Sequence, residues 1–236
     1  VSHDWLWALN PVHGATVAPG DFGTALRIRL GAHLTDEPVL WRRCGTEIME
    51  RTATHALCCA APEGTHGHYL VRDKLFPLVQ LADNNASIEV PELIPSAPAL
   101  RPADIYTEVA IPGTRAALDI GICSPDASGA GLDCCEAMWR KKRERYEPYF
   151  EEMAANGVRY MPVVLSCYGR LHLEAEAALA QLALQAGRRQ GVANHRALLR
   201  RASAAIGVVV QMRAVAMARA CLPTLGEEAL RLLLGE

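Results

Sequence analysis

The sequence lacks the marks of a membrane-spanning or secreted protein. No apolar run reaches the roughly 18 residues that a membrane helix needs, because the most apolar segment near the C-terminus, Ala202 to Val210, is short and Arg213 follows it. No charged-then-apolar signal segment follows Val1. We therefore expect a soluble piece of a longer protein, with no membrane among its partners.

A regular cysteine framework is also missing. The eight cysteines form two adjacent pairs and four scattered singles, unlike the spacing of small, disulfide-bonded secreted domains. This pattern favours a reducing, intracellular compartment, in which some thiols are buried and a few could bind a metal.

Neither sign of charge is in excess. The net charge of −2 argues against a uniformly basic coat for nucleic acid, although a local basic patch is compatible with it. The chain has 236 residues, 50% of them hydrophobic and 21% charged, which is an ordinary globular composition. It can bury the core of one large domain, or of one domain with an appendage.

The periodicity of the apolar residues predicts an α/β fold. Helical spacing over 69–81 is followed by three strand-like runs, a charged helix, a fourth strand and two long helices. This order of helix, three strands, helix, strand and helix suits a mixed sheet with helices on both faces. The runs after the first helix are 87–90, 104–109, 116–122, 133–155, 158–167, 172–190 and 195–221.

We divide the chain into four parts. A helical lead-in, with a short helix capped near Asp21, precedes a loop-rich segment of cysteines and histidines, an α/β core and the C-terminal helices. Their ranges are 1–40, 41–68, 69–190 and 191–236.

Two aspartates on neighbouring predicted strands are the first candidates for chemistry. Asp104 opens the second strand, and Asp119 lies between two large aliphatic residues in the third. A carboxylate flanked by apolar side chains costs free energy unless its charge is compensated, and Mg²⁺ or Mn²⁺ bound by both carboxylates would compensate it. Glu89, in the first strand, can extend the acidic group. The plainer alternatives are a salt-bridged strand acid for Asp119 and a turn acid for Asp104.

A lysine beside such a pair would position water or phosphate for phosphodiester hydrolysis. Nucleases of the PD-(D/E)xK kind usually carry it two residues after the second acid, where this chain has Gly121. The helix that follows can supply it instead, since Lys142 and Tyr146 share one helix face. The neighbouring cations could meet the DNA backbone, or could simply form a solvated helix face. They are Arg140, Lys141, Arg143 and Arg145.

These residues resemble a known family, the restriction-endonuclease-like domain near the C-terminus of non-LTR retrotransposon polyproteins. The resemblance spans about 40–170 and rests on segments 55–59, 66–73, 101–105, 117–120, 142–146 and 157–164. It implies a restriction-endonuclease-like core in which Asp104 and Asp119 bind Mg²⁺ and Lys142 is the catalytic lysine. By the same resemblance Glu89 is the additional acid, with Glu92 as the alternative, and Tyr146 and His68 join the cations in DNA binding.

The resemblance also implies a function. In that family the domain nicks target DNA, and the exposed 3′ hydroxyl primes reverse transcription by a separate polymerase domain, of which this sequence carries no signature. DNA and the reverse transcriptase domain of the same polyprotein would then be the partners, and the nucleus the location. Two alternatives stay open, namely a catalytically inactive DNA-binding remnant and a helical interaction protein built on 195–221.

A zinc knuckle before the core is a further implication of the resemblance. Cys44, His55, Cys59 and His66 could hold Zn²⁺, although Trp41 stands where such a knuckle usually begins with cysteine. The alternative is a degenerate knuckle in which Cys58 and Cys59 pack as small apolar side chains.

Overall fold

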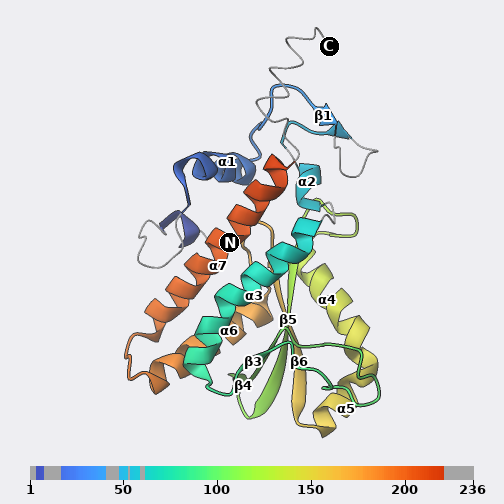
Figure 1. Cartoon of the computed structure of the whole chain (residues 1–236), viewed down its shortest axis with the longest axis vertical. Coiled ribbons are helices and arrows are strands. Elements are labelled where there is room, and N and C mark those ends of the chain that lie inside the picture. The colour runs from blue at the N-terminus through green and yellow to red at the C-terminus, as the bar shows by residue number, and fades with distance from the viewer. Residues whose placement is uncertain (1–3, 8–16, 41–47, 53, 59–61, 221–236) are drawn as a thin grey trace.

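The fold is a four-stranded mixed sheet with helices on both faces, as seen in a computed structural model that describes residues 4–7, 17–40, 48–52, 54–58 and 62–220 (Figure 1). The prediction of an α/β fold is confirmed at this level. The elements are η1 (Asp4–Trp7), α1 (Pro19–Leu30), β1 (Val39–Leu40), β2 (Ile48–Met49), α2 (Thr54–Cys58), α3 (Pro62–Ala82), β3 (Ser87–Ile88), β4 (Ile105–Ile111), β5 (Thr114–Cys123), α4 (Cys134–Tyr146), η3 (Glu147–Tyr149), α5 (Phe150–Ala155), β6 (Val158–Ser166), α6 (Leu173–Arg189) and α7 (His195–Arg219).

The four strands of this sheet lie in the order β3-β4-β5-β6, and β1 and β2 form a separate two-stranded sheet. Strands β3, β4 and β5 pair antiparallel, and Gly113 adopts a φ of 77° in the two-residue turn between β4 and β5. Strand β6 pairs parallel to β5 over its whole length, from Arg115 opposite Val158 to Cys123 opposite Ser166. A parallel pair needs a crossover connection, and α4, η3 and α5 provide it.

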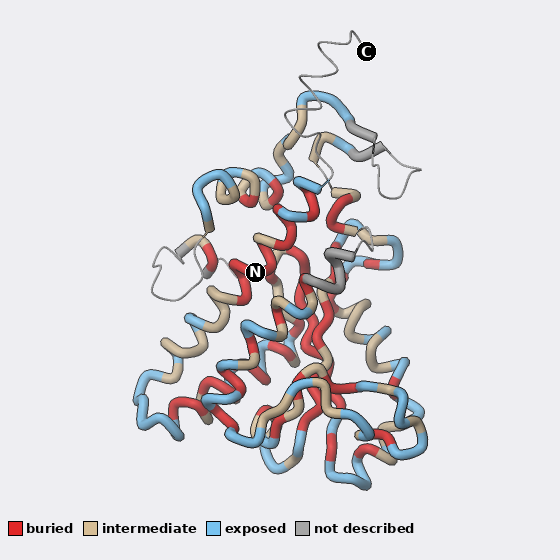
Figure 2. Tube along the Cα trace, viewed as in Figure 1, coloured by how far each residue is buried: buried red, intermediate tan, exposed pale blue. Residues whose placement is uncertain are grey.

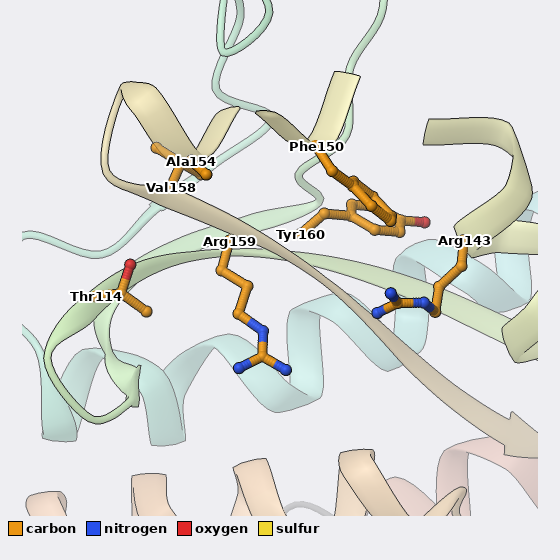
Figure 3. Close-up of a pocket in the computed structure, with 7 residues that line it drawn as sticks. All are labelled: Thr114, Arg143, Phe150, Ala154, Val158, Arg159 and Tyr160. Atoms are coloured by element: carbon orange, nitrogen blue, oxygen red, sulfur yellow. The ribbon is translucent and has the colours of Figure 1, made fainter. Parts of the chain in front are cut away.

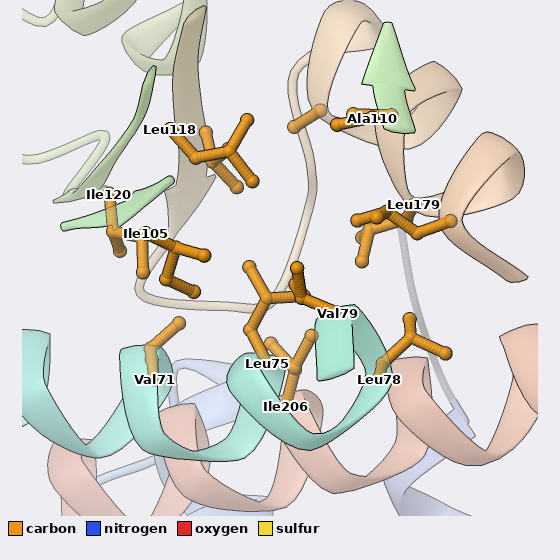
Figure 4. Packing of buried hydrophobic residues seen from close by; sticks show 14 of the residues in the cluster. Val71, Leu75, Leu78, Val79, Ile105, Ala110, Leu118, Ile120, Leu179 and Ile206 are labelled. Atoms are coloured by element: carbon orange, nitrogen blue, oxygen red, sulfur yellow. The ribbon is translucent and has the colours of Figure 1, made fainter. Parts of the chain in front are cut away.

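The two faces of β5 have different neighbours because side chains alternate along a strand. Leu118 and Ile120 point to the main core, which α3, α6 and α7 cover. Figure 4 shows Leu75 and its neighbours on α3 directed at these strand residues. On the other face, Ala117 and Asp119 are turned toward α4 and α5. Figure 2 shows the buried residues concentrated along the strands and the inner sides of the helices.

Helix α7 lies in the middle of this packing. It is long and apolar enough to cross a membrane by length and composition alone, but 61% of its most apolar window is buried inside the protein. Besides α3 and α6 it contacts η1 and α1, where Trp5 lies against Gly207 and Asp21 pairs with Arg219. Its apolar character is therefore accounted for by core packing.

Several predicted boundaries differ from the structure. Helix α3 begins at Pro62 rather than near Tyr69, because the first turns are polar and carry no apolar periodicity, whereas proline suits the first helical position. The part of the predicted loop-rich segment from Pro62 to His68 is therefore helical. Helix α1 begins at Pro19 with Ala18 as N-cap, so Asp21 lies in its first turn and does not cap it.

Two further differences concern the candidate site. The predicted helix over 133–155 is broken into α4, η3 and α5, because Pro148 has no N–H to continue the helical hydrogen bonds. Glu89 lies just beyond β3 rather than within it, with a left-handed φ of 51°. Asp104 directly precedes β4.

The core predicts a specific loss of stability on Leu179→Ala. Leu179 of α6 is 1% exposed in the main core, so its truncation leaves a cavity and should lower the free energy of unfolding by about 2–5 kcal/mol. Leu173 of the same helix is 78% exposed, and Leu173→Ala should change stability by less than about 0.5 kcal/mol. Denaturant unfolding of both variants measures the difference, and equal losses would contradict this packing.

Candidate functional site

One face of β5 presents a row of residues to α4. Asp119, Gly121 and Cys123 are two residues apart, and alternation therefore places them on the same face. Helix α4 presents a matching row, with Lys142 near Asp119 and Gly121, and Cys135 near Cys123. The candidate site lies along this contact between strand and helix.

The partly buried ion pair of Asp119 and Lys142 is the centre of the site. Lys142 Nζ donates a hydrogen bond of 2.7 Å to Asp119 Oδ1, and the side chains are only 20% and 13% exposed. Tyr160 of β6 donates to the other oxygen, Asp119 Oδ2. The register explains this, since β6 sets Tyr160 opposite Ala117 and Pro162 opposite Asp119, so that Tyr160 is the diagonal neighbour of Asp119.

Gly121 makes room for the lysine. A Cβ at this position would lie 2.5 Å from Cε of Lys142 and 3.3 Å from its Cδ. The aliphatic stem of Lys142 therefore crosses the strand where a side chain of residue 121 would project. A lysine supplied by the helix and a side chain at position 121 of the strand exclude one another sterically.

Asp104 joins the site from the position just before the neighbouring strand β4. Its Oδ1 lies 2.9 Å from Nε2 of His68 on α3, and its Oδ2 accepts a hydrogen bond of 2.6 Å from the backbone N–H of Ile120. The carboxylate thus links α3 to β5. His68, predicted to contact DNA, is here the partner of an acid.

The two carboxyl groups have opposite pKa shifts. Burial raises the pKa of Asp119 above its ordinary value of 3.8, although Lys142 and Tyr160 oppose the shift. Burial also acts to raise the pKa of Asp104, but the bond to His68 and the N–H of Ile120 outweigh it, so the pKa of Asp104 is lowered. Two nearby carboxyl groups whose pKa values are driven apart are typical of acid–base and metal sites.

Glu89 stands beside this pair but forms its side-chain contacts elsewhere. Its carboxylate pairs with Arg72, and Arg101 lies 4.0 Å away. Its backbone N–H donates to the carbonyl of Asp104 over 3.1 Å. Glu89 is therefore next to Asp104 along the backbone, with its charge compensated by arginine.

The cations of α4 differ in exposure. Lys141 and Arg145 are exposed, and so is Arg140, which pairs with Glu136. Arg143 lies between two rings, 4.8 Å from the centre of Trp139 and 5.0 Å from that of Phe150. The ring of Tyr146 is buried, and its hydroxyl donates to the carbonyl of Arg101, so in this structure it is not presented to DNA.

A cavity of about 360 Å³, lined by residues of β5, α4, α5 and β6, adjoins the acid group. Figure 3 shows the rings of Phe150 and Tyr160 side by side in its wall, together with Arg143 and Arg159. Tyr160 connects the cavity to the acid group, since its ring lines the cavity while its hydroxyl donates a hydrogen bond to Asp119. Two guanidinium groups and two rings suit a nucleotide or a phosphate.

The predicted zinc ligands are only partly described. Cys44 and Cys59 lie outside the described residues, as does the side chain of His66, whose backbone is in α3; His55 lies in α2. A different group could hold a metal, because three buried thiols lie within 4.8 Å of one another. They belong to Cys123, Cys134 and Cys135. The adjacent pair was visible in the sequence, but its approach to Cys123 depends on how α4 packs on β5.

Sequence reasoning also missed Tyr160 as a partner of Asp119. The two residues are 41 positions apart and meet only through the parallel register of β5 and β6.

Comparisons of the chain with protein-family models, curated proteins and solved structures found no match. The candidate site therefore rests on its own geometry.

The contact across Gly121 predicts a strong energetic coupling. Gly121→Ala should destabilise the protein by about 1–3 kcal/mol, because the new methyl group displaces the stem of Lys142. In a Lys142→Ala background the same substitution should cost almost nothing. A double-mutant cycle of unfolding free energies measures the coupling, expected at about 1–3 kcal/mol. Additive effects would mean that the lysine does not cross the strand here.

Proposed function

We propose that this chain is a metal-dependent DNA endonuclease domain with a restriction-endonuclease-like core. The observation that carries the proposal is the contact of Lys142 with Asp119, beside an Asp104 that is held by His68 and the strand backbone. An acid in β5, an acid just before the adjacent strand β4 and a lysine from the following helix are the side chains that phosphodiester hydrolysis needs at one place.

The donor set fits a hard divalent cation. Asp104 and Asp119 would hold Mg²⁺ or Mn²⁺ through carboxylate oxygens, and the lowered pKa of Asp104 keeps that group ionised at neutral pH. Once bound, the ion would supply positive charge to a phosphate oxygen and acidify a water molecule. Lys142 would orient the phosphate or the water, while Tyr160 and His68 fix the directions of the two carboxylates.

DNA would approach along the side of α4 and β6. Lys141 and Arg145 are exposed there, and Arg143 and Arg159 line the cavity that shares Tyr160 with the acid group. A local set of cations of this kind is compatible with the net charge of −2. By the resemblance stated above, the nick would prime reverse transcription by a polymerase domain of the same polyprotein, in the nucleus.

A second candidate is a catalytically inactive DNA-binding remnant of such a domain. One observation favours it, since all four carboxylate oxygens of Asp104 and Asp119 already have protein partners. Among the described residues, moreover, the three side chains whose possible metal-ligand atoms lie within 4.8 Å of one another are cysteines and not acids. A cation at the aspartates would therefore have to share them with Lys142 and His68.

The nuclease proposal predicts that Lys142→Ala and Asp119→Asn each lower the rate of plasmid nicking by at least about 100-fold, because both remove charge from the reacting centre. The chain has three lysines, and the third, Lys74, is exposed on α3 away from the site. Lys74→Ala should retain the wild-type rate. The assay follows relaxation of supercoiled DNA with Mg²⁺ or Mn²⁺ present.

The same preparations separate the two candidates. An inactive remnant would bind DNA in a salt-dependent manner without nicking it, and Asp119→Asn would leave that binding intact or strengthen it. Wild-type protein that binds DNA but never nicks it with either ion would reject the nuclease and support the remnant.

The pKa shift of Asp119 predicts an acid limb in the nicking rate. Activity requires the ionised carboxylate and should fall as pH drops through a pKa above 3.8. The hydrogen bond from Tyr160 lowers that pKa, so Tyr160→Phe should move the limb to higher pH. Tyr149→Phe, in the same apolar cluster, is the control and should leave the limb in place. A limb unmoved by Tyr160→Phe would show that Asp119 does not set it.

A further inference from the structure

Three buried thiols join the end of β5 to the start of α4. Cys123 is the last residue of β5, and Cys134 and Cys135 are the first two residues of α4. They are 8%, 7% and 0% exposed, and their Sγ atoms all lie within 4.8 Å of one another. Such mutual closeness of three thiols from two elements goes beyond the ordinary burial of single cysteines.

The spacing of the sulfur atoms matches metal coordination. At a tetrahedral zinc ion with Zn–S bonds of about 2.3 Å, two sulfur ligands are about 3.8 Å apart. Sγ of Cys123 and Sγ of Cys135 are already 3.7 Å apart. The carbonyl oxygen of Arg170, 3.5 Å from Sγ of Cys135, lies at the edge of the group. Sulfur ligands favour zinc and other thiophilic ions over Mg²⁺.

The surroundings of the three sulfurs act in opposite directions on their charge. Cys134 and Cys135 lie in the first turn of a 13-residue helix, where the helix dipole stabilises anions, whereas the negative charge of the N-cap Asp133 opposes a thiolate on Cys135. The hydrogen bond from Cys123 lowers the pKa of Cys135, and the charge of Arg170 assists against the effect of burial. The contact with Cys135 and burial raise the pKa of Cys123, and burial raises that of Cys134, so a bound cation would be needed to hold all three as thiolates.

We propose that Cys123, Cys134 and Cys135 bind a zinc ion that fastens the N-terminus of α4 to the end of β5. This site is separate from the residues of the predicted knuckle, and binding at it does not depend on the nuclease proposal. The ion closes the ten-residue loop between Cys123 and Cys134. Asp119 lies four residues before Cys123, and Lys142 lies two helical turns after Cys135, so the ion also fixes the register in which those two residues meet.

The test uses the full chain, purified under reducing conditions with Zn²⁺ and analysed for bound metal. We expect Cys123→Ser and Cys135→Ser each to lose one equivalent of zinc per chain. The double variant Cys44→Ser/Cys59→Ser removes the knuckle ligands and should keep that equivalent, and Cys58→Ser serves as a further thiol control. Zinc content that is unchanged by Cys123→Ser and Cys135→Ser would overturn the proposal.

A second measurement detects the site in the wild type itself, which guards against misfolded variants. Cd²⁺ added to the metal-free wild type should give thiolate-to-cadmium absorbance that corresponds to three sulfur ligands, and Cys44→Ser/Cys59→Ser should retain it. A hundredfold excess of Zn²⁺ over its Kd should raise the Tm of the wild type by roughly 5–10 °C and leave that of Cys123→Ser unchanged. Cys123 and Cys135 found joined as a disulfide, or as free thiols without metal, would refute the site. These measurements do not involve nicking, so their outcome is independent of the nuclease proposal.

Discussion

The pairing of Asp119 with Lys142 is the interaction on which the arrangement of this half of the molecule depends. A carboxylate in the middle of a buried strand is tolerated only if a cation and hydrogen bonds reach it, and removal of one partner of such a pair costs about 3–5 kcal/mol. Lys142 reaches it because Gly121 leaves the strand open, and Tyr160 reaches it because β6 runs parallel to β5 in one register. The acid therefore constrains a helix, a glycine and a neighbouring strand together.

This compensation also shapes how a metal could enter. With Lys142 and Tyr160 on Asp119, and His68 on Asp104, the acid group is satisfied without any ion. The binding free energy of a divalent cation would have to exceed the free energy of the hydrogen bonds that the cation weakens. A phosphate that draws Lys142 toward itself would free an oxygen of Asp119. Substrate and metal would then bind cooperatively, because each lowers the free energy needed to accommodate the other.

The sequence reveals those features of the site that depend on near neighbours. Asp119 stands out because of its aliphatic flanks, Lys142 because of the cationic run around it, and Gly121 because it occupies a position where a lysine is expected. The roles of His68 and Tyr160 are not visible there, since their contacts with Asp104 and Asp119 join segments 36 and 41 residues apart. Such contacts depend on strand register and on the start of α3, which its polar first turns conceal.

The cysteine group extends the same reasoning along the strand. Helix α4 touches the β5 row at two places, with Lys142 on Asp119 at one and Cys135 beside Cys123 at the other. In the proposed nuclease the first would be an ion pair that a substrate loosens, whereas the proposed zinc–thiolate bonds would not be loosened by phosphate. A helix fixed at its N-terminus by zinc would let its lysine move without leaving the sheet. The metal contact would limit the motion of α4, and the ion pair of Lys142 would remain free to take part in the proposed reaction.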